Sequence, residues 1–196
     1  MPGRSGRSAD APTGVFDTFA RNIEVAALDE HQFVHLLETL RILDDAEAGY
    51  QLRHLSTDTL AAIVRDASKE QLNALEEHRE LRRVFLDEIF DRMSQHFLPD
   101  KAAQTELVLS WRFSGGNGTG GYDRYQTIIE DGRCRSGRNL ARQQHTTLTL
   151  CVADFIRLAT GNANIATMFV SGRVRVKGDY APAVRFSSYF DMPKPG

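Results

Sequence analysis

The feature that most constrains the fold of this chain is a segment near its C-terminus in which two glycines separate stretches of different period. Residues 163–170 are largely apolar and contain no Pro or Gly, which favours a short helix that Gly172 ends. Residues 173–177 alternate basic residues with valine, the pattern of a strand with one wet and one dry face. Gly178 ends this strand, and residues 180–190 are predicted to form a last short helix. The segment contains no nucleophile motif, metal cluster or phosphate loop, so it indicates architecture around an apolar interior.

The whole chain changes period near Pro99, which divides it into a helical part and a strand-rich part. Before Pro99, apolar residues recur at helical spacing, ending in an i, i+4 ladder over residues 81–97. After it, alternation of apolar and polar residues predicts strands at 107–113, 122–130, 133–137 and 145–152, and a helix at 154–160. The glycine-rich residues 114–121 are predicted to be a hairpin turn, because a phosphate loop would need a helix after it and strand character continues instead.

Three helix starts are marked by side chains that can cap them. Asp29 with Gln32 and Ser68 with Gln71 have the three-residue spacing of capping boxes, and Ser56 precedes a third run of helical period. The first helix of the chain is predicted over residues 15–28. These patterns predict that the part of the chain before residue 78 is built from helices alone.

The order of these elements resembles the sterol carrier protein type two (SCP-2-like) lipid-binding domain family. The strongest motif is Phe-x-x-Gly-x-x-x-x-x-Gly-Asp, carried here by Phe169, Gly172, Gly178 and Asp179. Further matches to the family pattern are Asp154, Phe155, Leu158 and Gly161. The resemblance covers about residues 81–190; the sequence departs from the family in the long glycine loop, at residues 162–164 and over its first eighty residues.

The resemblance implies an α+β fold, with a five-stranded, mostly antiparallel sheet and helices covering one face, preceded here by an all-α N-terminal region. We therefore expect a disordered tail at residues 1–14, a helical accessory domain at 15–78 and an SCP-2-like lipid-binding domain at 79–196. The family has a hydrophobic tunnel for sterols, fatty acids or acyl-CoA esters. The resemblance thus implies that this chain binds and carries a hydrophobic small molecule, with no catalysis and no cofactor.

Apolar residues of the strands and the three short C-terminal helices are the candidates for lining such a tunnel. Composition alone favours an ordinary core for them, because apolar helix faces are usually core, and only the resemblance favours a tunnel. The predicted lining residues are Trp111, Phe113, Tyr125, Phe155, Leu158, Ile165, Met168, Phe169, Phe186 and Phe190.

Basic residues are predicted to gather on the wet face of the sheet: Arg112, Arg173, Arg175 and Lys177. Residues 29–100 hold 16 acidic and 8 basic side chains, whereas residues 101–196 hold 7 and 13. Three uses of the basic face stay open: solvation alone, docking of the acidic helices within one chain or across a homodimer, and binding of an anionic lipid headgroup or CoA phosphate.

Groups that could carry out chemistry are sparse. His31 and His35 have the i, i+4 spacing that can share a metal ion, but no third ligand is evident, so no metal site is predicted. His145, Asp154 and Arg157 are acid–base candidates if the chain is instead an enzyme or enzyme subunit acting on a hydrophobic metabolite. A third hypothesis is a protein-interaction module whose cavity is vestigial.

Composition limits the partners and the compartment. The net charge is −2, which gives no general attraction to nucleic acid, and no run of residues reaches the length of a membrane span. Cys134 and Cys151 make no disulfide framework, so a reducing cytoplasm is expected. Twenty arginines against four lysines favour a GC-rich bacterial genome.

Overall fold

The computed structural model describes residues 15–48, 55–138 and 140–193. Its helical part contains α1 (Val15–Arg21), the 3-10 turn η1 (Val25–Ala27), α2 (Glu30–Ala48), α3 (Thr57–Asp66), α4 (Lys69–Glu77), α5 (Arg79–Gln95) and η2 (Pro99–Lys101). Its sheet part contains β1 (Leu107–Ser114), β2 (Tyr122–Glu130), β3 (Arg133–Gly137), β4 (Thr146–Leu150), α6 (Val152–Ala159), α7 (Ile165–Val170), β5 (Arg175–Gly178), α8 (Tyr180–Arg185) and η3 (Phe186–Tyr189). The tail predicted at residues 1–14 lies outside the described residues.

The five strands form one sheet in the order β3-β2-β1-β4-β5. Only β1 and β4 pair in parallel, and the other three neighbouring pairs are antiparallel. The alternation of apolar residues in β1 decides the two faces: Leu107, Leu109, Trp111 and Phe113 point to the helices. We call this the inner face and the opposite one the outer face. The α+β fold with helices over one face of a mixed sheet is the one that the sequence predicted.

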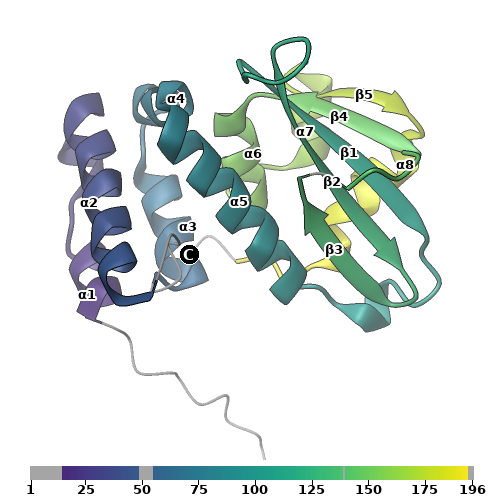
Figure 1. Ribbon diagram of the computed structural model, residues 1–196, viewed down its shortest axis with the longest axis horizontal. Coiled ribbons are helices and arrows are strands. Elements are labelled where there is room, and N and C mark those ends of the chain that lie inside the picture. Colours follow the sequence, from purple (N-terminus) through teal and green to yellow (C-terminus); the bar gives the residue numbers. More distant parts are fainter. Residues whose placement is uncertain (1–14, 49–54, 139, 194–196) are drawn as a thin grey trace, which may run out of the picture.

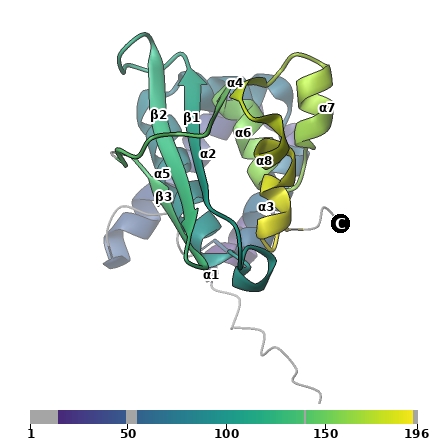
Figure 2. The same ribbon diagram turned by 90° about the vertical axis from the view of Figure 1, so that its right-hand side faces the viewer.

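The parallel pairing of β1 with β4 requires a crossover, because β3 and β4 lie on opposite sides of the β2–β1 pair. The chain makes this crossing over the outer face, and Figure 2 shows the segment passing across β2 and β1. It is held there by Gln126, which donates to the Arg142 carbonyl (2.9 Å) and accepts from its amide (3.1 Å). One end of the outer face is therefore covered by this segment.

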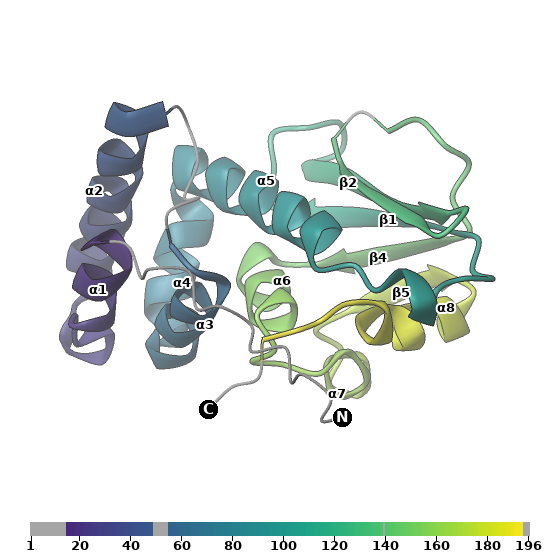
Figure 3. The ribbon, with the colours of Figure 1, turned by 90° about the horizontal axis from the view of Figure 1, so that it is seen from below.

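The helices are arranged in layers beside the sheet. In Figure 3, α5 and α6 lie between the sheet and the group formed by α1 to α4, and Figure 1 shows the same order from the side. One cluster of buried apolar side chains runs through these layers. It begins at Ala20 on α1, includes residues of the helices from α3 to α6, and ends at Phe190. The predicted boundary near residue 78 coincides with the junction of α4 and α5, and the apolar cluster is continuous across it.

The predicted caps at all three helix starts are confirmed. The Ser68 hydroxyl accepts from the Gln71 amide while the Gln71 side chain accepts from the Ser68 amide, a complete capping box. Asp29 and Gln32 make the same reciprocal pair, at 2.8 and 3.0 Å. Ser56 accepts from Thr59 at the start of α3. These bonds satisfy amides that a helix leaves without a partner in its first turn.

A buried arginine ties the helices to the sheet. Arg82, on α5, is only 5% exposed, and its guanidinium donates to Asp123 Oδ2 (2.7 Å) on β2 and to the Ser114 carbonyl (2.7 Å) at the end of β1. Glu76, on α4, lies 3.6 Å from the same guanidinium and accepts from the Ala153 amide at the start of α6. A charge with several partners is tolerated in the interior, whereas an unpaired one is not.

Three predicted element boundaries need correction. The strand predicted over 173–177 begins only at Arg175, because Arg173 lies in the turn before it. The last helix, predicted as one element over 180–190, consists of α8 followed by the 3-10 turn η3. The first predicted helix ends at Arg21, and its second half is the short turn η1. No described helix is long and apolar enough to cross a lipid bilayer.

Candidate ligand-binding site

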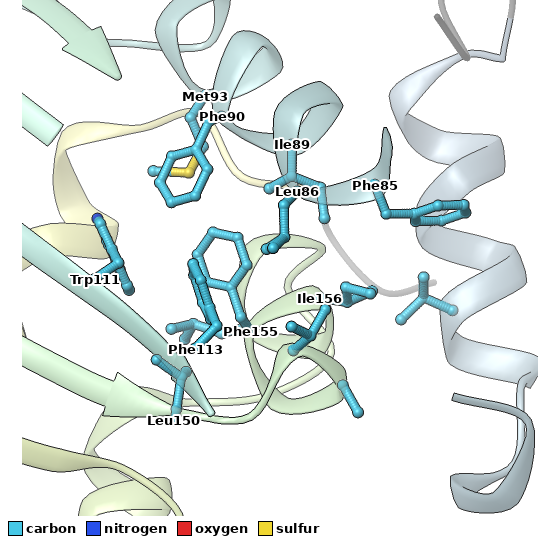
Figure 4. Close-up of a cluster of buried hydrophobic side chains, with 14 of the residues drawn as sticks. Phe85, Leu86, Ile89, Phe90, Met93, Trp111, Phe113, Leu150, Phe155 and Ile156 are labelled. Atoms are coloured by element: carbon cyan, nitrogen blue, oxygen red, sulfur yellow. The ribbon is translucent and has the colours of Figure 1, made fainter. Parts of the chain in front are cut away.

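A group of stacked aromatic rings fills the space between α5 and the inner face of the sheet. Phe90, on α5, stacks on Tyr125 with 4.6 Å between ring centroids and on Phe155 with 4.9 Å. Trp111 meets Phe90 edge-on at 5.9 Å. Figure 4 shows Phe90 and Met93 reaching from α5 toward Trp111, Phe113 and Phe155. All of these rings are nearly or fully buried, so this part of the interior is tightly packed core.

A small cavity lies beside the aromatic group, beneath the C-terminal helices. Its volume is about 20 Å³, and a neighbouring one toward α3 and His96 has about 30 Å³. The residues around the first are almost all apolar: Met93, Trp111, Phe155, Leu158, Ala159, Ile165, Phe186, Ser187, Phe190 and Met192. Sites for small molecules have volumes of about 300–1,000 Å³, so an apolar ligand requires these side chains to move apart.

The segment that closes this cavity consists of two short elements and the residues that follow them. α8 has 6 residues and η3 has 4. Phe190 follows η3 and pairs with Phe97 in an isolated β-bridge, in which the Leu98 amide donates to Tyr189 and the Asp191 amide donates to His96, both at 2.8 Å. Met93 and Met192, at the cavity wall, are unbranched and adapt easily to a change of shape. The segment from Phe186 to Met192 is thus held by these two hydrogen bonds and by the contacts of its rings with Trp111 and Phe97.

Six of the ten residues predicted to line a tunnel surround this cavity: Trp111, Phe155, Leu158, Ile165, Phe186 and Phe190. Phe113 and Tyr125 lie instead in the aromatic group, and Met168 is buried apart from the cavity. Sequence reasoning missed Met93, Ala159 and Met192. The ladder that contains Met93 was visible in the sequence, but only the crossing of α5 over β1 decides which of its members reaches the cavity.

Phe169 does not lie in the interior, so its predicted position is wrong. It is 41% exposed and its ring packs against that of Tyr180, 4.5 Å away. Ile165 and Met168 are the buried residues of the same helix, and Phe169 lies to one side of them, about 100° around the axis from Met168 and about 40° from Ile165.

The polar end of Tyr125 is fixed at the rim of the aromatic group. Its hydroxyl donates to Asp87 Oδ1 (2.7 Å), and Arg138 Nε donates to the same hydroxyl (2.6 Å). Burial, and then the adjacent Asp87 carboxylate, hold the pKa of Tyr125 well above its usual range. The phenol therefore stays neutral, and its two hydrogen bonds link Asp87 on α5 with Arg138 at this rim.

The glycines and the aspartate of the C-terminal motif shape the backbone. Gly172, after α7, has φ +74°, and Gly178 has φ +102°, conformations that other residues rarely adopt. A Cβ at Gly178 would lie 2.4 Å from the His145 carbonyl oxygen. Asp179 caps α8 by accepting from the Ala181 amide at 3.0 Å. These three residues of the motif therefore act on the backbone conformation.

The predicted acid–base residues do not come together. His145 is exposed just before β4, where its Nδ1 accepts from the Val108 amide (3.2 Å), and Asp154 follows the other end of this strand. Asp154 is paired with Arg173, whose Nε donates to it at 3.2 Å. Arg157 donates to the Ala67 carbonyl (3.1 Å). Each group has a structural partner, and His145 faces away from the cavity.

The predicted basic face is partly assembled. Arg112 on β1 and Arg175 on β5 both stand opposite Thr149 in the sheet register, which aligns them in one row on the outer face, and Lys177 lies on the same face. Arg173 does not belong to it, because it precedes the strand and pairs with Asp154 on the helix side. α3 and α4 dock on α5 and α6, away from this face, so the acidic helices do not cover it within one chain.

Both cysteines are free and half-buried. Burial raises the pKa of the Cys134 thiol to about 11 and that of Cys151 to about 12. Each therefore stays a neutral thiol and packs against the core. Within the described residues, no group of three or more His, Cys, Asp or Glu side chains is arranged to hold a metal ion.

The sequence model of the family described as alkyl sulfatase C-terminal matches residues 74–196. The chain belongs to this family. The match begins near the end of α4 and takes in α5, the sheet and the C-terminal helices. No curated protein sequence matched the chain.

Solved structures of two kinds resemble it. The stereoselective inverting sec-alkylsulfatase Pisa1 from Pseudomonas sp. is 14% identical over 95% of this chain and 33% of its own, with a TM-score of 0.48. Palmitated sterol carrier protein 2-like 2 from Aedes aegypti is 12% identical over 55% of this chain and 96% of its own, with a TM-score of 0.43. Sterol carrier protein 2 from Yarrowia lipolytica is 23% identical over 48% of this chain and 87% of its own, with a TM-score of 0.36.

The two kinds of structure cover different shares of the chain. The sterol carrier proteins match about half of it and most of their own length. The chain spans about a third of the length of the alkylsulfatases that it matches. The sequence match shows the alkyl sulfatase C-terminal family, and the solved sterol carrier proteins meet the predicted resemblance over about half of the chain.

Proposed function

We propose that this chain binds one apolar small molecule between the inner face of its sheet and the C-terminal helices, and carries it without chemistry. The observation that supports this most is the apolar cavity between Trp111, Ile165 and Phe186, closed by a short segment. The ligand classes that we propose are a sterol, a fatty acid, an acyl-CoA ester or a polycyclic metabolite. A palmitated sterol carrier-like protein is among the structures of similar fold.

Binding requires the cavity to widen. A ligand that displaces Phe186, Phe190 and Met192 joins the two small cavities and gains contact with the rings of the inner face. Burying hydrocarbon yields about 0.8 kcal/mol per CH2, so a fourteen-carbon chain yields on the order of 11 kcal/mol. Loss of ligand freedom and the cost of opening the wall subtract from this, so we expect affinities in the micromolar range, about −8 kcal/mol.

A matched pair of substitutions tests the proposed site. Phe186→Ala removes a ring from the cavity wall, whereas Phe169→Ala removes an equal ring from the exposed side of the neighbouring helix. We expect Phe186→Ala to change the affinity for a fluorescent fatty acid at least about tenfold, the effect of about 1.4 kcal/mol, and Phe169→Ala to leave it within about twofold. Equal effects of the two changes would contradict the assignment.

Native mass spectrometry of the gently purified protein, followed by extraction of any bound molecule, tests the function itself. A stoichiometric apolar ligand supports the carrier. A ligand-free mass that persists after incubation with fatty acids, sterols and acyl-CoA esters favours the alternative of a protein-interaction module with a vestigial cavity, for which the tight packing of the aromatic group provides some support.

A second candidate function follows from the family. An alkyl sulfatase C-terminal domain that holds the apolar part of a substrate could serve as part of an enzyme, with the chemistry supplied by another domain or chain. His145, Asp154 and Arg157 are too dispersed to supply it. Under this alternative the chain forms a stable complex with a catalytic protein, which size-exclusion chromatography of the two purified partners would detect.

Two further parts of the proposal concern assembly and location. Docking of the acidic helices on the basic outer face is possible only between two copies, because the layers separate them within one chain; light scattering across a salt series would detect such a homodimer by its loss at high salt. We also propose a bacterial, cytoplasmic setting.

A further inference from the structure

The outer surface of α7 and α8 carries an unusual concentration of exposed apolar side chains. Of the six large apolar residues exposed in the described chain, four lie here: Phe169, Val170, Tyr180 and Val184. Val170 is the most exposed of the four, at 87%. The other two, Phe19 and Ile42, lie on α1 and α2. We call the four residues the α7–α8 patch.

The patch is continuous. Phe169 and Tyr180 pack ring against ring at 4.5 Å, which joins the two helices. Tyr180 and Val184 are four residues apart on α8 and so lie on one side of that helix. Figure 2 shows α7 and α8 beside each other at the edge of the fold. An exposed apolar group of this kind marks a contact surface, since scattered single residues are the ordinary case.

Basic residues accompany the patch, although the chain as a whole is acidic. Residues 165–190 contain four basic side chains and one acidic side chain, whereas the net charge of the chain is −2. Arg185, which follows Val184 on α8, is exposed and, within the part of the chain that the structure describes, makes no ion pair. Arg173 is half exposed beside its partner Asp154. Apolar side chains next to the unpaired charge of Arg185 match the chemistry of an anionic bilayer, with its apolar interior beneath negative headgroups.

The patch is also the outer side of the two helices that close the apolar cavity. Ile165, on α7, and Phe186, directly after α8, both line the cavity from within. From these observations we propose that the α7–α8 patch docks the protein on an anionic lipid surface. Docking itself does not depend on the proposed carrier function, but it would place one wall of the cavity next to the bilayer.

Vesicle co-sedimentation of the whole chain tests this proposal. We expect the protein to pellet with vesicles of phosphatidylcholine and phosphatidylglycerol in a 7:3 ratio, and to do so at least about tenfold less with phosphatidylcholine alone. A basic residue near an anionic surface contributes about fivefold in affinity, so Arg185→Glu should reduce binding by at least about fivefold, whereas Arg175→Glu, on the outer face of the sheet, should change it less. Binding should also fall with added salt.

The apolar contribution is tested with a matched control. Val170→Glu places a carboxylate in the patch, and Ile42→Glu makes the same kind of change at a 57% exposed residue on α2. We expect at least about a tenfold loss for the first, since a charge resists entry into the interface, and no loss for the second. Both positions are exposed, so the fold should survive, and circular dichroism would check it.

Three results would overturn the proposal: no pelleting with either vesicle, Val170→Glu that pellets like the unchanged protein, or Val170→Glu that turns a dimer into a monomer. The last result would make the patch a contact between copies. Binding of a fluorescent fatty acid in the absence of vesicles is measured in the same variant. We expect it unchanged, and its loss would concern the carrier function rather than the docking.

Discussion

Replacement of Phe90 tests the packing that joins the helices to the sheet. The Phe90 ring is 1% exposed, stacks on Tyr125 and on Phe155, and meets the edge of Trp111. Phe→Ala in a core costs about 3–5 kcal/mol for lost transfer energy and the cavity left behind. Aromatic pairs are worth about 0.5–1.5 kcal/mol each beyond their buried area, and Phe90 makes two stacked ones. We therefore expect Phe90→Ala to cost about 5 kcal/mol.

The series Phe90→Leu and Phe90→Ala separates volume from ring stacking. Leucine retains most of the volume, so we expect it to cost about 2 kcal/mol, close to the value of the lost ring pairs. Urea unfolding followed by circular dichroism and by the fluorescence of Trp111, the one tryptophan of the chain, gives both values. Phe19→Ala, at a 51% exposed ring on α1, is the control, with an expected cost below about 0.5 kcal/mol. A cost below about 2 kcal/mol for Phe90→Ala would refute the view that this ring holds the two layers together.

Two further predictions concern the backbone and pH. Gly178→Ala should cost about 2 kcal/mol or more, because its backbone has φ +102° and the new Cβ would lie 2.4 Å from the His145 oxygen; Gly132→Ala, with φ +66° and open space, should cost less in the same urea unfolding. Burial alone would raise the pKa of Asp17, but hydrogen bonds from Thr59 and Ser56 and the charge of Arg21 outweigh it and lower the pKa. The stability that Asp17 contributes should therefore be present above its ordinary value of 3.8 and be lost as pH falls through its lower folded value, so that the difference from Asp17→Asn shrinks in acid unfolding. A difference that grows in acid would contradict this sign.

Local chemistry was readable because it depends on residues close together in the sequence. The capping pairs at Asp29, Ser56 and Ser68 all formed as their spacing indicated, since a cap needs only the next turn of its own helix. The alternation in β1 likewise indicated which side of the sheet is apolar. Gly172 and Gly178 marked backbone conformations that few other residues adopt.

The error at Phe169 shows where such reasoning ends. An apolar residue on a six-residue helix can face either way, and the helical period cannot choose when apolar residues occupy more than one side. Arg173 was assigned to a strand because the alternation of basic residues and valine starts at Arg173, one pair of residues before the pairing with β4 begins at Arg175. Its ion pair with Asp154 joins residues 19 apart, which no local pattern indicates.

The sequence by itself determined the fold class, the strand boundaries in the hairpins and the resemblance to lipid-binding domains, because periodicity, turn residues and caps are local properties. Only the tertiary structure decided which apolar residues surround a cavity and which are exposed, since that depends on how α5 crosses β1 and how α7 packs beside α8. Packing between distant elements fixes these positions, and no local pattern in the chain encodes them.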